Sequence, residues 1–148
     1  MSQLGPVHAP ICFYLPSKPI GHYEGLSQPL LSEQLIQNGG NHWRKILTIA
    51  AKLCAPNENW KDYRDNFLFT SNEQMRFASE KLTNAASLHF VCGQQSYQKL
   101  NIRQTPNKTS SPKVHYLANV IVLPYLDYRQ FPNKDIEIAR KMIQNFNI

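Results

Sequence analysis

Short runs of hydrophobic residues recur along the chain, and each has the length of a buried strand. The four clearest runs are residues 11–15, 67–70, 88–92 and 120–123. A smaller run at residues 114–116 predicts a short additional strand. The main runs are apolar almost throughout, which is typical of strands in a parallel sheet, where both sides of each strand are covered.

Segments with helical periodicity separate these runs. The clearest begins at Asn41, a favourable N-cap, and ends before Pro56. It carries apolar residues at offsets of three, four, seven, ten and eleven from Trp43. Gly39 and Gly40 separate it from a shorter helix that precedes it. The other predicted helices cover residues 30–37, 72–84, 94–100 and the segment after Pro132.

Strands and helices therefore alternate along the chain, which predicts the α/β class. We expect a three-layer sandwich with a central, mostly parallel sheet of about four strands and helices on both faces. The length of 148 residues is typical of one domain, and no internal repeat divides the chain. Residues 1–148 are therefore interpreted as a single α/β domain.

Composition narrows the setting in which this domain works. The hydrophobic fraction of 42% is that of a globular protein. No run of 18 apolar residues occurs and the first ten residues do not resemble a signal peptide, so we expect a cytoplasmic protein without a membrane partner.

The three cysteines, Cys12, Cys54 and Cys92, lie far apart, each inside an apolar stretch. This arrangement predicts reduced, buried thiols rather than a disulfide framework. No paired-cysteine or paired-histidine spacing typical of a metal site occurs, so neither a metal nor a cofactor is expected.

The formal charge of +6 is unevenly distributed. Residues 81–126 contain no Asp or Glu, and we call this segment the acid-free stretch. It carries five cations: Lys81, Lys99, Arg103, Lys108 and Lys113. Such asymmetry favours an anionic partner, either nucleic acid or a nucleotide. The alternative is a protein that is basic without using its charge.

The predicted sheet also indicates where a ligand would bind. In an open parallel sheet the ligand crevice lies beyond the carboxyl ends of the strands. The polar residues expected there are Ser17, Lys18, Ser71, Asn72, Gly93, Gln94, Tyr125, Asp127 and Arg129. We interpret them as one pocket for a phosphate-bearing or nucleobase-like ligand, with Tyr125 or Tyr128 as a stacking face. The alternative is that they are helix caps and rim residues.

No catalytic motif accompanies this pocket. A phosphate-binding P-loop, a dinucleotide-binding glycine fingerprint and a nucleophile elbow are all missing from the sequence. His22 and His42 are candidate bases, and Asp127 is a candidate to orient a histidine. The catalytic residues are unknown from the sequence, and whether the protein is an enzyme stays open.

The order of elements resembles the uracil-DNA glycosylase superfamily. Residues 11–25 are similar to its first strand and glycine-containing loop, and residues 40–47 to its glycine-led helix. Residues 67–72, 88–100 and 120–132 follow in the order of its later strands and helices. The resemblance implies an α/β scaffold that binds nucleic acid.

Two positions depart from that superfamily's chemistry. The Asp or Asn that activates water in that superfamily has no clear counterpart, since Ser17 and His22 are poor substitutes for it. Tyr125 stands in the motif that normally supplies a histidine. Three scattered cysteines also cannot hold a four-cysteine iron–sulfur cluster. The resemblance therefore implies a scaffold with absent or feeble uracil excision. A small accessory protein that acts through protein–protein contacts, without catalysis, is the alternative function.

Overall fold

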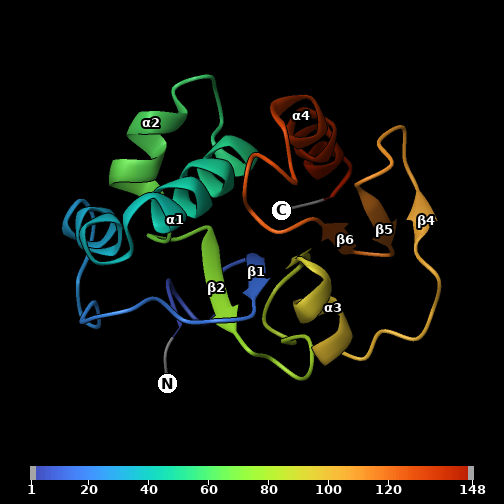
Figure 1. Ribbon diagram of the computed structural model, residues 1–148, viewed down its shortest axis with the longest axis horizontal. Coiled ribbons are helices and arrows are strands. Elements are labelled where there is room, and N and C mark those ends of the chain that lie inside the picture. Colours follow the sequence, from blue (N-terminus) through green and yellow to red (C-terminus); the bar gives the residue numbers. More distant parts are fainter. Residues whose placement is uncertain (1–2, 147–148) are drawn as a thin grey trace.

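A six-stranded mixed sheet forms the centre of the computed structural model, which describes residues 3–146 (Figure 1). The strand order is β2-β1-β3-β6-β5-β4. Four strands run parallel: β1 (Ile11–Leu15), β2 (Glu73–Phe77), β3 (Leu88–Cys92) and β6 (Val120–Leu123). The α/β class is confirmed. The sheet is larger than expected because β4 (Asn107–Lys108) and β5 (His115–Leu117) extend it in antiparallel fashion.

Helices cover the two faces of the sheet unequally. One face carries α1 (Leu30–Cys54), α2 (Trp60–Asp62) and α4 (Asn133–Met142), together with short π and 3₁₀ turns at Tyr63–Phe67 and Ile143–Asn145 (Figure 1). In the described part of the chain, the other face carries only the six-residue α3 (Gln94–Lys99) and irregular segments. The sandwich therefore has the expected three layers, but its second helical layer is thin.

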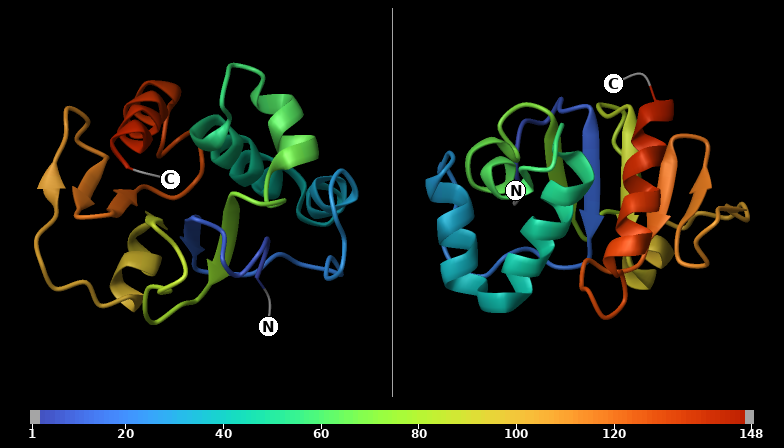
Figure 2. Two further views of the ribbon diagram at one scale, coloured as in Figure 1. Left: turned by 180° about the vertical axis from the view of Figure 1, so that it is seen from behind. Right: turned by 90° about the horizontal axis from the view of Figure 1, so that it is seen from above.

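The helical segment predicted from Asn41 supplies the main core contacts. Helix α1 runs from Leu30 to Cys54, but Gly40 has φ 62° and ψ −146°, so two helical segments meet there at a bend (Figure 2). Only glycine adopts such a backbone conformation without strain. The two helices predicted on either side of Gly39 and Gly40 are thus present.

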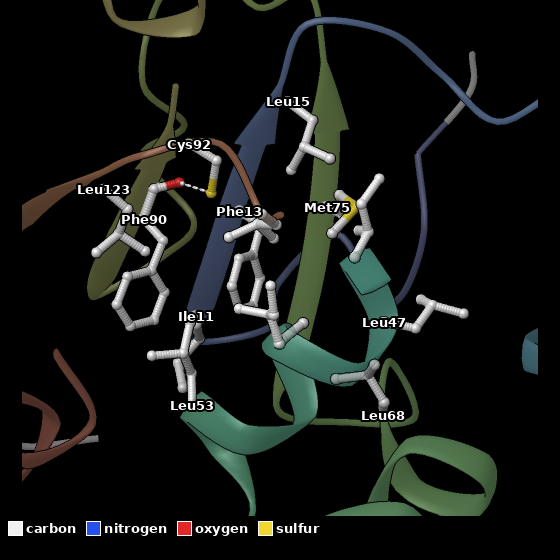
Figure 3. Packing of buried hydrophobic residues seen from close by; sticks show 14 of the residues in the cluster. Ile11, Phe13, Leu15, Leu47, Leu53, Leu68, Met75, Phe90, Cys92 and Leu123 are labelled. Atoms are coloured by element: carbon white, nitrogen blue, oxygen red, sulfur yellow. Dashed lines mark hydrogen bonds between the residues drawn. The ribbon is translucent and has the colours of Figure 1, made fainter. Parts of the chain in front are cut away.

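The principal core lies between α1 and the sheet (Figure 3). Phe13 of β1 and Phe90 of β3 stack with ring centroids 5.0 Å apart and are fully buried. Leu47 and Leu53 of α1 pack from the helix side. Because each buried side chain of this size contributes roughly 1.5–3 kcal/mol, this cluster holds β1 and β3 together at the centre of the sheet.

The strand predicted at residues 67–70 and the helix predicted after it are both wrong. Phe67 is the last residue of a π-helical turn and is half-exposed. Leu68 and Phe69 join the core, but Phe69 has φ 66° and the run does not enter the sheet. The strand is instead Glu73–Phe77, whose first two side chains are polar and buried. Gln74 donates to the carbonyls of Val7 and Ala9, and these tertiary contacts are invisible to a hydrophobicity pattern.

The cysteines contribute to packing. Cys12 and Cys92 are fully buried and free, as predicted, whereas Cys54 is only partly buried. Burial raises the pKa of the Cys12 thiol to about 11, so it stays protonated at neutral pH. Among residues 3–146, no three His, Cys, Asp or Glu side chains form a group suited to a metal ion. No helix in the same range is long and apolar enough to cross a membrane.

Glu73, at the amino end of β2, is a fully buried carboxyl group. It accepts hydrogen bonds from the Tyr63 hydroxyl and from the backbone N–H of Phe69, 3.1 Å away. Desolvation nevertheless dominates and raises the pKa of Glu73 from 4.5 to about 7. The folded protein therefore retains this proton at pH values where the unfolded chain releases it.

Glu73→Gln should increase stability at pH 8 and leave it nearly unchanged near pH 4.5. Protonated Glu73 favours the folded state below its unfolded pKa of 4.5, and this stability is lost as pH rises through about 7. The loss is on the order of 3 kcal/mol, which chemical denaturation at the two pH values will measure. The exposed Glu137→Gln is the matched control. An equal effect of Glu73→Gln at both pH values would contradict this account.

Candidate functional site

The parallel strands bring their carboxyl ends to one edge of the sheet. In the register of the sheet, Leu15, Phe77, Cys92 and Leu123 end the four parallel strands, and we call the edge they form the carboxyl edge. Strand β2, which follows β1 in the sequence, pairs on one side of β1, and the next strand, β3, pairs on the other side of β1. The connection thus reverses direction between β1 and β3, where doubly wound sheets bind their ligands.

The structure brings together seven of the nine predicted site residues at this edge and separates two. Ser17 and Lys18 follow β1, Gly93 and Gln94 follow β3, and Tyr125, Asp127 and Arg129 follow β6. Ser71 and Asn72 lie at the opposite edge, because β2 begins at Glu73 and the Asn72 carbonyl accepts from the N–H of Ile11. Their predicted place is taken by Ala78 and Ser79, which follow β2 and which no pattern in the sequence indicated.

The seven residues do not form one pocket. Ser17 and Lys18 line a hollow of about 460 Å³ beyond β1 and β2, which we call the lysine hollow. Within residues 3–146, its lining consists of Gln3, Pro16, Ser17, Lys18, Arg76, Phe77, Ala78 and Ser79. A second hollow, which we call the tyrosine hollow, lies beyond β3 and β6. The expected single crevice is therefore divided in two.

The tyrosine hollow has a volume of about 480 Å³. Its lining includes Tyr97, Tyr125, Lys113, His115 and Arg129, together with Gly93, Gln94, Pro112, Val122, Leu123, Pro124 and Gln130. Two tyrosines and two permanent cations thus line it, and no carboxylate within residues 3–146 does. Lys113 comes from the acid-free stretch and Arg129 from the loop after β6, so sequence reasoning found Arg129 as a site residue but missed Lys113 and His115.

Gly93 shapes the floor of the tyrosine hollow. Its φ of 90° and ψ of 160° belong to a region that is essentially restricted to glycine. A Cβ atom at this position would lie 3.4 Å from the Cβ and Cδ1 atoms of Tyr125. This distance is an ordinary contact, so the backbone conformation and not the space beside Tyr125 requires glycine here.

His42 and Tyr125 form the aromatic wall beside this floor. A hydrogen bond of 2.7 Å joins His42 Nε2 to the Tyr125 hydroxyl, and the rings stack with centroids 5.7 Å apart. Burial raises the pKa of Tyr125 to about 12, so the hydroxyl stays protonated. His42 is a first-turn residue of the helical segment after Gly40. The sequence indicated His42 as a candidate base and Tyr125 as a candidate stacking face. It could not show that these two side chains, 83 positions apart, contact each other.

Asp127 forms ion pairs with two cationic side chains, Arg129 and Lys45. It accepts from the backbone N–H of Arg129 at 3.0 Å and from its guanidinium at 3.3 and 3.4 Å, and Lys45 Nζ lies 3.7 Å away. The backbone and side-chain hydrogen bonds from Arg129 lower the pKa of Asp127. The hypothesis that Asp127 orients a histidine is wrong, because within residues 3–146 its partners are these two cations.

Tyr128, the other candidate stacking face, does not line either hollow. The ammonium group of Lys52 lies 4.9 Å from the centroid of its ring, and the ring packs against the core on the α1 side. Tyr125 is therefore the one of these two tyrosines that is positioned for a ligand at the carboxyl edge.

A double-mutant cycle will test the aromatic wall. We expect His42→Ala and Tyr125→Phe to show a coupling energy of about 0.5–1.5 kcal/mol in denaturant unfolding, because both remove the same hydrogen bond. The exposed His22→Ala, combined with Tyr125→Phe, is the matched control and should be additive. Additivity in both cycles would show that His42 and Tyr125 do not interact in solution.

Comparison with known proteins identifies the family but not the activity. A family model described as "Family of unknown function (DUF6942)" matches residues 2–144. No curated protein and no solved structure matches the chain. The chain belongs to the DUF6942 family.

Proposed function

We propose that this protein binds a nucleotide or a short segment of nucleic acid at the carboxyl edge, with a base in the tyrosine hollow. The observation that carries the proposal is the lining of this hollow, which combines tyrosine rings with Lys113 and Arg129 and, among the described residues, contains no carboxylate. Aromatic faces that stack bases, beside cations that contact phosphates, are the usual means of binding nucleic acid without strict sequence preference.

The cations of the tyrosine hollow keep donors for a phosphate. Lys113 Nζ uses one N–H to reach the Gln130 carbonyl at 3.0 Å, and the Arg129 side chain is 84% exposed. Asp127 forms ion pairs with both Lys45 and Arg129. Its single negative charge neutralises one of these two cations, so the three side chains together keep one positive charge. The exposed cations of the acid-free stretch add a positive field that attracts polyanions.

The aromatic wall provides a rigid stacking element. The His42 ring stacks against the Tyr125 ring, and the hydrogen bond between them fixes the position of the Tyr125 hydroxyl. A base that binds here therefore stacks on a ring that is already held in place. Pre-ordering of this kind reduces the entropy lost on binding. Base stacking on an aromatic side chain contributes about 1–3 kcal/mol per base.

The resemblance to uracil-DNA glycosylases favours the nucleic-acid form of this proposal. The cations bound to Asp127, and the pairing of His42 with a tyrosine, leave neither residue arranged as an activated base. We therefore propose binding without uracil excision, so that no uracil is released from DNA under conditions in which DNA is bound.

A second candidate, an accessory protein that acts through protein contacts, is favoured by a different surface. An apolar groove of about 570 Å³ lies at the edge of the sheet opposite the carboxyl edge. Leu82, Leu100, Ile102, Leu117 and Val120 line it, with Lys81 and Arg103 among the flanking polar residues. Such a groove fits a protein segment better than a nucleotide.

Salt-dependent binding separates the two candidates. The affinity for fluorescent single- and double-stranded DNA, measured by anisotropy at several salt concentrations, should fall steeply as salt rises. Arg129→Gln and Lys113→Gln should each cost about 1 kcal/mol or more and reduce the salt slope by about one unit. Tyr125→Ala should cost about 1–3 kcal/mol, largely independent of salt.

Lys61→Gln on α2 removes the same charge from an exposed position outside both hollows and serves as the control. It should change binding much less than Arg129→Gln. If the wild-type protein bound neither DNA nor nucleotides in a salt-sensitive manner, the proposal would be replaced by the accessory-protein function.

A further inference from the structure

A small cavity of about 50 Å³ lies where the chain connection reverses, between the ends of β1 and β2 and helix α3. Its lining consists of Tyr14, Leu15, Pro16, Ala78, Ser79, Gln95, Ser96, Lys99 and Leu100. Pro16, Ala78 and Ser79 also line the lysine hollow, so the two spaces adjoin. Neither space shares a lining residue with the tyrosine hollow.

Ser96 gives this cavity an unusual polar wall. The residue is only 5% exposed, and its hydroxyl has no hydrogen-bond partner among residues 3–146. Buried hydroxyl groups are normally paired, and a serine inside a helix commonly donates to the carbonyl one turn earlier. Ser96 lines the cavity, so a polar group that entered it would supply the partner that this buried hydroxyl lacks within residues 3–146.

Three cations surround the joined spaces. Lys99 lines the small cavity, and Lys18 and Arg76 line the lysine hollow. No carboxylate lines either space, and none of the three cations forms a salt bridge within the described part of the chain. Arg76 is half-buried, and its Nε donates to Gln74 Oε1 at 2.8 Å, which holds the guanidinium of this lining residue in place.

We propose that Ser96, Lys99, Lys18 and Arg76 form a second binding site, which takes the phosphoryl group of a small phosphomonoester. The phosphoryl oxygens accept from the Ser96 hydroxyl and from the cations, which match a dianion in charge and in hydrogen-bonding capacity. The lysine hollow, with Phe77 and Pro16 in its lining, takes the organic part. The site is independent of the proposed function of the tyrosine hollow, because the two share no residue.

The Ser96 hydroxyl allows a test with little risk to folding. Ser96→Ala removes a buried group that has no protein partner within residues 3–146, so the variant should be at least as stable as the wild type in phosphate-free buffer. Inorganic phosphate and ribose 5-phosphate are the probes, with ribose and sodium chloride at equal ionic strength as blanks. Amide chemical shifts and the melting temperature are recorded for each.

With inorganic phosphate, we expect the amide chemical shifts of Ser79 and Ser96 to change until the site is saturated. Ribose 5-phosphate should bind more tightly than phosphate, and ribose or sodium chloride should cause no saturable change. Ser96→Ala should weaken the binding of both phosphate probes at least about fivefold and reduce the rise in melting temperature. Arg76→Gln should weaken it at least about tenfold. Lys113→Gln, in the tyrosine hollow, should change it less than about twofold.

Non-saturable shifts, or equal affinity of Ser96→Ala and the wild type, would overturn this second site. Saturable binding of free phosphate with no gain for ribose 5-phosphate would overturn the assignment of a phosphomonoester. These failures leave nucleic-acid binding in the tyrosine hollow untouched, because that binding is read out by Tyr125→Ala. Loss of phosphate binding in Lys113→Gln would instead show that the two sites are one.

Discussion

The parallel pairing of β1 with both β2 and β3 is the constraint on which the rest of the molecule depends. All five residues of β1 are buried, with Phe13 packed on one face and Tyr14 on the other. Because both neighbours run parallel to β1, the segments that follow the strands meet at the carboxyl edge. The reversal of the chain connection beside β1 then separates those segments and leaves space between them.

The polar residues near this edge are arranged by contacts that do not depend on a ligand. Gly93 lies beside Tyr125 at the end of β3, and His42 holds the tyrosine from α1. Gln74 positions Arg76 at the end of β2. Groups that are already held in place lose little entropy on binding, which supports the proposal that both hollows receive ligands. The surplus of cations over carboxylates among the described lining residues of both hollows is the basis for proposing anionic ligands.

The sequence pattern was sufficient for the elements whose burial is apolar. The runs at β1, β3 and β6, and the helical periodicity after Asn41, predicted the α/β class and most of the carboxyl edge. The hydrophobicity pattern did not predict β2, because Glu73, Gln74 and Arg76 of this strand are held by hydrogen bonds instead of by apolar packing. That one error moved Ser71 and Asn72 to the wrong edge and concealed Ser79. The pairing of His42 with Tyr125 and the free hydroxyl of Ser96 are consequences of tertiary structure, which no local pattern encodes.

Amide hydrogen exchange with and without single-stranded DNA tests most directly whether the carboxyl edge is the ligand-binding surface. We predict slower exchange, on addition of DNA, in the segments that line the tyrosine hollow, namely residues 93–97, 112–115 and 122–130. Residues 71–72, at the opposite edge, should exchange at unchanged rates. Slower exchange confined to residues 100–104 and 117–120, which line the apolar groove, would contradict the assignment of the binding surface to the carboxyl edge.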